Sequence, residues 1–88
     1  MSFEVRLHPD VNRFLEKCNL SLKERIVSKL RLLKENPEHY LDHLQGTDYA
    51  KLRIGDYRCL IDLDLKRKIV FVRVIDHRRR IYQKIPES

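Results

Sequence analysis

Two stretches of the sequence, residues 51–58 and 76–82, combine the residue types that can bind and cleave a phosphodiester. The first reads K-L-R-I-G-D-Y-R and the second D-H-R-R-R-I-Y. Arginine offers planar, bidentate donors to phosphate oxygens, and tyrosine can stack on a nucleobase. A histidine, with an ordinary pKa of about 6.5, can give or take a proton near neutral pH. Together they indicate a site for a nucleic-acid backbone.

The net charge of the chain is concentrated around these stretches. The 88 residues carry a net charge of +6, yet residues 1–50 hold 8 basic and 8 acidic side chains. Residues 51–84 hold 11 basic and 4 acidic side chains, a net of +7. Such a concentration favours a polyanionic partner, because a small acidic molecule would not need so many charges. The simpler alternative is a solvated basic surface, and Arg79 and Arg80 fit that description best.

A strand and a tight turn are predicted to bring the first basic residues together. Lys51 and Arg53 alternate with apolar residues, so both project from one face of their strand. The Gly55-Asp56 turn then returns Arg58 on the neighbouring strand. A third strand, rich in β-branched residues, delivers His77, Arg78 and Tyr82 at its end. The predicted strands of this region are residues 49–54, 57–63, 69–75 and a short last one at residues 81–85, before Pro86.

The N-terminal half is predicted to be scaffold. Residues 3–7 alternate apolar and charged side chains as in a strand, and an amphipathic helix follows to about Asn19. Ser21 and Glu24 form an S-x-x-E capping box at the start of a second helix, which ends at Asn36-Pro37. Residues 37–47 are a connector with a possible extra turn.

This order of elements predicts an α+β fold. An N-terminal strand is followed by an antiparallel helix hairpin, which packs on one face of a mostly antiparallel sheet of four or five strands. Because the helices cover one face, the other face is expected to be open and to carry the basic side chains. Residues 1–88 are expected to form a single domain.

Several other kinds of site are not expected. The two glycines cannot build a Gly-rich phosphate loop, and Cys18 and Cys59 lack zinc-binding spacing. His39 and His43 are four residues apart but have no evident further ligand. The sequence shows neither a signal peptide nor a membrane-spanning run. We therefore expect a cytoplasmic protein with no cofactor, no metal site and no membrane association, and with reduced cysteines.

The motif K-L-R-x-G-x-Y-R, an apolar hairpin strand and the ending H-R-x-x-x-Y, behind a helix pair, resemble the RelE/ParE superfamily of toxin–antitoxin toxins. The resemblance covers essentially the whole chain. Within that superfamily the RelE-like branch consists of endoribonucleases that cleave messenger RNA in the ribosomal A site. Attack of an RNA 2′-OH on the adjacent phosphate would leave a 2′,3′-cyclic or 3′-phosphate end and a 5′-OH.

The resemblance, with the chemistry of the side chains, implies roles for individual residues. The candidate catalytic residues are Lys51, Arg53, Arg58, His77, Arg78 and Tyr82. The candidate RNA-binding residues are Arg73, Arg79, Arg80 and Lys84. The 2′-OH needs a base and the leaving 5′ oxygen needs a proton, for which Lys51 and His77 are the candidates. Arg58 and Arg78 fit phosphate clamping and transition-state stabilisation, and Tyr82 fits stacking.

Structural alternatives remain open for several of these side chains. Tyr82 is also suited to packing on an edge strand, and His77 to ending a strand with a hydrogen bond. Arg73 lies inside an apolar strand, where it faces either the open side of the sheet or an acidic group of a partner.

The sequence departs from the RelE-like pattern at one position. Ribosome-dependent members carry two lysines one residue apart before the glycine turn, whereas this chain reads Tyr49-Ala50-Lys51. The missing lysine keeps two alternatives open: a ParE-like inhibitor of DNA gyrase without nuclease activity, and a non-enzymatic nucleic-acid-binding module. The toxin interpretations imply an acidic or amphipathic, RelB-like antitoxin in a hetero-oligomer, and the RelE-like one adds the ribosome and messenger RNA as partners.

Overall fold

A five-stranded sheet forms the centre of the computed structural model, which describes residues 2–85. The two ends of the expected domain, and Pro86, lie outside the described residues. The strand order is β1-β5-β4-β3-β2, with β1 parallel to β5 and every other pair antiparallel. The strands are β1 (Glu4–Leu7), β2 (Asp42–His43), β3 (Ala50–Ile54), β4 (Tyr57–Asp64) and β5 (Ile69–His77). The predicted α+β architecture is confirmed.

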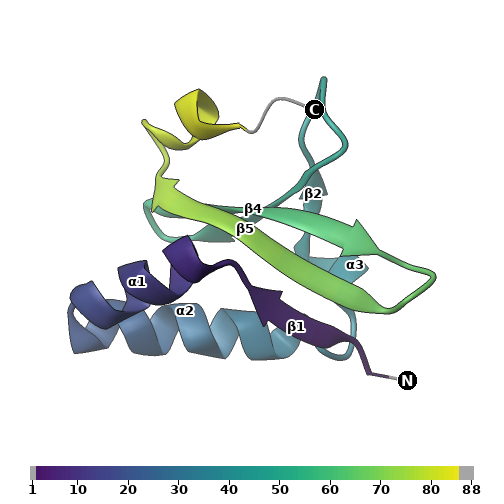
Figure 1. The fold of residues 1–88 in the computed structure, drawn as a ribbon, viewed down its shortest axis with the longest axis horizontal. Helices are drawn as coiled ribbons and strands as arrows, with labels where there is room; N and C mark the ends of the chain where they lie inside the picture. The colour runs from purple at the N-terminus through teal and green to yellow at the C-terminus, as the bar shows by residue number, and fades with distance from the viewer. Residues whose placement is uncertain (1, 86–88) are drawn as a thin grey trace.

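Two helices, α1 (Pro9–Lys17) and α2 (Leu20–Leu32), pack on one face of the sheet (Figure 1). His8 caps α1 by accepting the N–H of Asp10. Asn19 caps α2 by accepting the N–H of Leu22 at 2.8 Å. The predicted Ser21/Glu24 capping box is therefore wrong, because α2 begins at Leu20 and its N-cap residue is Asn19 rather than Ser21.

The connector holds more structure than one extra turn. Pro37 starts a short helix, α3 (Pro37–Tyr40), where a missing backbone N–H costs nothing. The two residues of β2 follow and pair with Lys51 and Ala50 on β3. The connector thus supplies the edge of the sheet next to the basic strand.

The main core lies between the helices and the sheet. Buried residues of both helices meet alternate residues of β3 and β4, as the period-2 pattern predicted, and also pack against β5. Fully buried members include Val11, Ile26, Leu33, Leu52, Ile54, Cys59, Ile61, Val70 and Val72. None of the helices in the described part of the chain has the length and apolar character that crossing a membrane requires.

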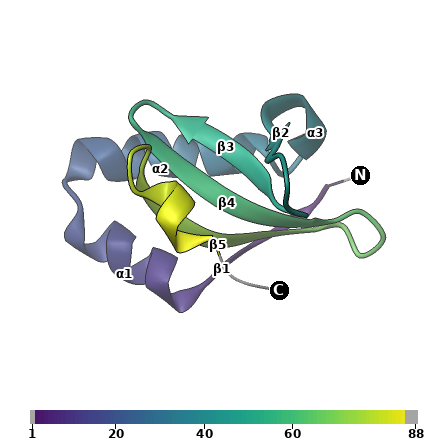
Figure 2. The same cartoon turned by 90° about the horizontal axis from the view of Figure 1, so that it is seen from above.

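The opposite face of the sheet was expected to be open, but part of it is covered. A 3₁₀ helix, η1 (Ile81–Lys84), lies over β4 and β5 on this face (Figure 2), which we call the η1 face. Its Ile81 is fully buried against Leu44 and Leu60. The predicted strand at residues 81–85 is therefore wrong, because turn hydrogen bonds (Arg80 N–H to the His77 carbonyl, and Gln83 N–H to that of Arg80) fold the chain back onto the sheet.

A β-bulge interrupts the pairing of β4 with β5. Leu60 pairs with Val74 but its neighbour Ile61 pairs with Val72, so Arg73 is an extra residue on β5. Val72 packs in the main core, and Val74 packs on the η1 face. The bulge therefore reverses the alternation for the rest of β5, and so decides which face each of its last residues occupies.

Candidate phosphodiester-binding site

Three charged residues form a row across the η1 face. Arg53 on β3 pairs in register with Arg58 on β4, and Arg58 pairs with Asp76 on β5. Lys51 is the next residue along this face of β3, opposite Leu60. The structure therefore allows Lys51, Arg53 and Arg58 to act together, as predicted. It also places an acidic residue, Asp76, beside them.

Arg58 is buried, with 6% of its surface exposed. Its Nη1 donates to the carbonyl oxygens of Gly55 (2.7 Å) and Tyr57 (2.8 Å), so the guanidinium is fixed beneath the β3–β4 turn. Within residues 2–85 it makes no ion pair with a carboxylate. A buried arginine without an acidic partner, beside a second arginine, is suited to binding an anion.

Asp76 is equally buried, with 5% of its surface exposed. Its Oδ1 accepts the backbone N–H of His77 at 2.7 Å and Nε of Arg80 at 3.2 Å, and its Oδ2 lies 2.7 Å from Nζ of Lys84. Burial by itself would raise the pKa of Asp76, but the bonds from Lys84, His77 and Arg80 outweigh it and lower the pKa. The carboxylate is therefore ionised and holds the C-terminal element against the sheet.

Arg78 and Tyr82 lie on the segment that η1 folds over this face. The backbone N–H of Arg78 donates to the Asp56 carbonyl at 2.7 Å, and its Nε lies 4.0 Å from Asp56 Oδ1. Tyr82 is exposed over 49% of its surface. The β3–β4 turn thus ties the C-terminal segment to the strands that carry Arg53 and Arg58, while Tyr82 remains accessible for stacking.

His77 lies on the opposite face from the arginine row. Its ring packs edge-on against Tyr57 at 5.7 Å, and Tyr57 packs in the same way against Phe14 of α1 at 5.6 Å. Its Nδ1 accepts the backbone N–H of Arg79 at 3.3 Å. His77 was expected in the same site as the basic residues, but the bulge at Arg73 turns it toward the helix side, away from the arginine row.

Comparison with known proteins decides the family. The model of the ParE toxin of type II toxin–antitoxin systems, parDE, matches residues 5–82. The chain belongs to this family. Curated protein sequences gave no match.

Solved structures of RelE toxins share the fold of this chain. The archaeal RelE–RelB complex from Pyrococcus horikoshii matches with a TM-score of 0.78 and 25% identity over 91% of this chain and 99% of that one. The RelBE2 toxin–antitoxin complex of Mycobacterium tuberculosis matches with a TM-score of 0.79 and 22% identity over 88% and 99%. A doubly substituted E. coli RelE toxin in the free state matches with a TM-score of 0.73 and 22% identity over 94% and 93%.

The predicted RNA-binding residues of the toxin occupy three different environments. Arg73, on the bulge, is half-buried with its guanidinium 5.4 Å from the centre of the Phe71 ring. Arg79 is exposed and forms no ion pair with any residue between 2 and 85. Arg80 and Lys84 are both bound to Asp76. Two of the four are therefore committed to an internal carboxylate rather than free for RNA.

Asp76 is the residue of this site that sequence reasoning missed. A signal was present, since it is the only acidic residue between residues 65 and 84 of a strongly basic segment. A lone acid at the end of an apolar strand is a strong candidate for an internal counter-ion. Its pairing with Lys84 and Arg80 depends on η1, which was expected to be a strand.

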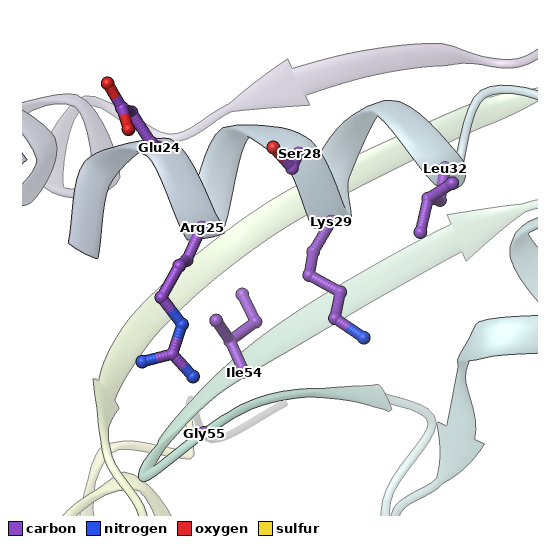
Figure 3. Close-up of a pocket in the computed structure, with 7 residues that line it drawn as sticks. All are labelled: Glu24, Arg25, Ser28, Lys29, Leu32, Ile54 and Gly55. Atoms are coloured by element: carbon purple, nitrogen blue, oxygen red, sulfur yellow. The ribbon is translucent and has the colours of Figure 1, made fainter. Parts of the chain in front are cut away.

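A separate groove of about 340 Å³ lies on the helix side of the toxin, between α2 and β3 (Figure 3). Arg25 and Lys29 extend from α2 on either side of Ile54, and Arg25 approaches Gly55 at the β3–β4 turn. The turn that fixes Arg58 is therefore packed from the helix side as well.

Titratable groups elsewhere do not form a second site of this kind. No cluster of three histidine, cysteine or acidic residues suited to a metal ion occurs among residues 2–85. Cys18 and Cys59 are both free. Burial raises the pKa of the Cys59 thiol to about 12, so it stays protonated at neutral pH and acts as a core residue.

Proposed function

We propose that the toxin is an endoribonuclease that cleaves messenger RNA in the ribosomal A site and is neutralised by a cognate antitoxin. The observation that carries this proposal is that Arg53 lies opposite Arg58 on the η1 face, and that Arg58 is buried and makes no ion pair within residues 2–85. Lys51 lies on the same face, and Arg78 and Tyr82 are brought toward it by the C-terminal segment. Membership of the toxin family and the likeness to toxin–antitoxin complexes support it.

The proposed reaction is a transesterification followed by release of the downstream strand. The RNA 2′ oxygen loses its proton to a base and bonds to the adjacent phosphorus, and the bond to the 5′ oxygen breaks. The departing 5′ oxygen takes a proton, which leaves a 2′,3′-cyclic phosphate and a 5′-OH. Charge that develops on the non-bridging oxygens is stabilised by Arg58 and Arg53. Fixed donors need no reorganisation during this step, and Arg58 is held in place by two carbonyls.

The face of the sheet on which a residue lies limits which residues can transfer a proton in this reaction. Lys51 shares the η1 face with the arginine pair and is the candidate base. His77 points to the helix side, away from the face that would hold this phosphate, and is not a candidate for this proton transfer. Arg78, on the segment tied to the β3–β4 turn, is the candidate second clamp and hydrogen-bond donor to the leaving 5′ oxygen, which takes its proton from water. Tyr82 is the candidate platform for a nucleobase.

The test is primer extension on a translated message, with the toxin and ribosomes present. Cuts at codon spacing are expected, and they should be lost in Arg58→Ala and Arg78→Ala. Arg31→Ala, an exposed arginine of α2 outside the site, is the matched control and should cut normally. An intact message with the unaltered toxin would rule out the proposed activity.

A second function, inhibition of DNA gyrase, is favoured by two observations. The matching family model is that of ParE, and one of the two lysines expected before the glycine turn is absent. This function predicts trapped DNA breaks and lost supercoiling on expression, while translation continues at first. Measuring protein synthesis and plasmid supercoiling in the same culture separates the two functions.

A further inference from the structure

Arg58 and Asp76 are opposite charges that are in position to pair but do not. They are register partners on adjacent strands, and each is almost fully buried. The Cβ atoms of cross-strand neighbours lie about 4.5–5.5 Å apart, so side-chain rotation alone can join a guanidinium and a carboxylate. Instead Arg58 donates to the carbonyls of Gly55 and Tyr57, and Asp76 binds Lys84 and Arg80.

Loss of Lys84 and Arg80 would leave Asp76 as a buried carboxylate that retains only the His77 N–H. An uncompensated buried charge is strongly unfavourable, so the carboxylate would take another cation if one is within reach. Arg58 is its cross-strand neighbour and makes no ion pair within the described chain. The expected consequence is an exchange of partners, in which Asp76 turns from the C-terminal segment to Arg58.

We propose that Lys84 and Arg80 are positioning residues, which hold Asp76 away from Arg58 and so leave the Arg58 guanidinium free to bind a phosphate. When they do not occupy Asp76, its carboxylate pairs with Arg58 and quenches the phosphate site. This inference rests on the proposed function only in so far as Arg58 binds the nucleic-acid backbone. Docking of η1 and the anion affinity of the sheet are then coupled through one carboxylate.

Because of this coupling, Asp76 could block phosphate binding by Arg58, but its pairing with Lys84 and Arg80 prevents this in the folded toxin. Ile81 anchors η1 in the apolar cluster with Leu44 and Leu60, so the charged pairs and the apolar contact hold the same segment. That segment also carries Tyr82. When the segment is docked, Tyr82 is in place for stacking and Arg58 is free to bind phosphate. When the segment is undocked, both are lost from the site.

The binding experiment uses a 2′-O-methyl RNA oligonucleotide, which cannot be cleaved, and measures affinity by fluorescence anisotropy. Replacing both cations, Arg80→Gln with Lys84→Gln, should weaken binding about tenfold, since a hydrogen bond to a charged group is lost at Arg58. The matched control, Arg31→Gln with Lys66→Gln, removes the same charge from exposed positions without touching Asp76. It should weaken binding distinctly less.

The decisive variant adds Asp76→Asn to the doubly substituted toxin. Affinity should return to that of the matched control, because a neutral amide no longer competes for Arg58. Adding Asp62→Asn instead removes an equal negative charge from an exposed position and should restore much less. If Asp76→Asn restores no more than Asp62→Asn, or if Arg58→Gln leaves binding unchanged, the inference is overturned.

A second measurement keeps the test independent of folding and of nuclease activity. The ¹⁵N and ¹H shifts of the Arg58 Nε–H group report its partner directly. They should move in the doubly substituted toxin and move back when Asp76→Asn is added, whereas unchanged shifts would contradict the exchange. If the oligonucleotide results hold but messenger RNA is not cut, the nuclease proposal fails and the inference stands.

Discussion

Arg53 and Arg58 lie directly opposite each other on adjacent antiparallel strands. Like charges in this position repel, which destabilises the sheet by a few tenths to about 1 kcal/mol. Arg53→Thr should therefore raise the free energy of unfolding by up to about 0.5 kcal/mol, while it lowers affinity for single-stranded RNA. Urea unfolding and anisotropy on the same samples measure both effects. Arg79→Thr, which removes an equal charge with no arginine opposite, should give no stabilisation.

Because Ile81 anchors η1 to the sheet, its replacement by alanine is expected to cause a large loss of stability. Ile81 is fully buried in the cluster with Leu44 and Leu60. Ile81→Ala should lower the free energy of unfolding by about 2–4 kcal/mol and increase exchange of the amides of η1. Denaturant unfolding and hydrogen exchange provide the measurements. A change of less than about 1 kcal/mol would mean that η1 is only loosely docked. Tyr82→Ala, at an exposed neighbour, is the control.

Gly55 and Gly46 form a matched pair for backbone strain. Both have positive φ angles, +57° and +80°, which cost a side chain about 1–2 kcal/mol. A Cβ at Gly55 would also lie 2.5 Å from the Arg25 Nη2, whereas nothing lies within 4 Å of one at Gly46. Gly55→Ala should thus destabilise at least as much as Gly46→Ala. Any excess should vanish in an Arg25→Ala background, and an excess that persists there would show that Arg25 is not its cause.

Asp76 predicts a stability change at acidic pH. Its pKa is lowered in the folded toxin, so its contribution is present above the unfolded pKa of about 3.9 and is lost as pH falls through the folded value. The stability difference between the unaltered toxin and Asp76→Asn should therefore shrink as pH decreases below about 4. Urea titrations at several pH values measure this difference. A constant difference down to pH 2 would contradict the role of the ionised carboxylate.

Cys59 should resist alkylation in the folded toxin. The thiol is fully buried and its pKa is raised to about 12, so the reactive thiolate is absent at pH 8. Iodoacetamide should modify Cys59 only after denaturant is added, as mass spectrometry of the digested peptides would show. Cys18, which is half-buried, is the internal comparison and should react sooner. Equal rates for both thiols in the native toxin would refute this expectation.

The bulge at Arg73 marks where sequence reasoning reached its limit. Uninterrupted alternation from Val70 and Val72 would put His77 on the η1 face and Asp76 in the core. The extra residue reverses this order, since Ile75 packs in the main core and Val74 on the η1 face. The bulge depends on how β4 and β5 pack together, and no residue type in β5 predicts it.

Local pattern by itself determined the basic half of the site. Period-2 alternation put Lys51 and Arg53 on one face, and the two-residue turn at Gly55 set Arg58 opposite Arg53, because both rules act within a few residues. Only the tertiary structure decided that Asp76 lies beside Arg58 on the η1 face, that His77 lies on the other face, and that η1 brings Lys84 to the Asp76 carboxylate. These relationships depend on a bulge and on burial of Ile81 against distant residues, which are long-range packing effects.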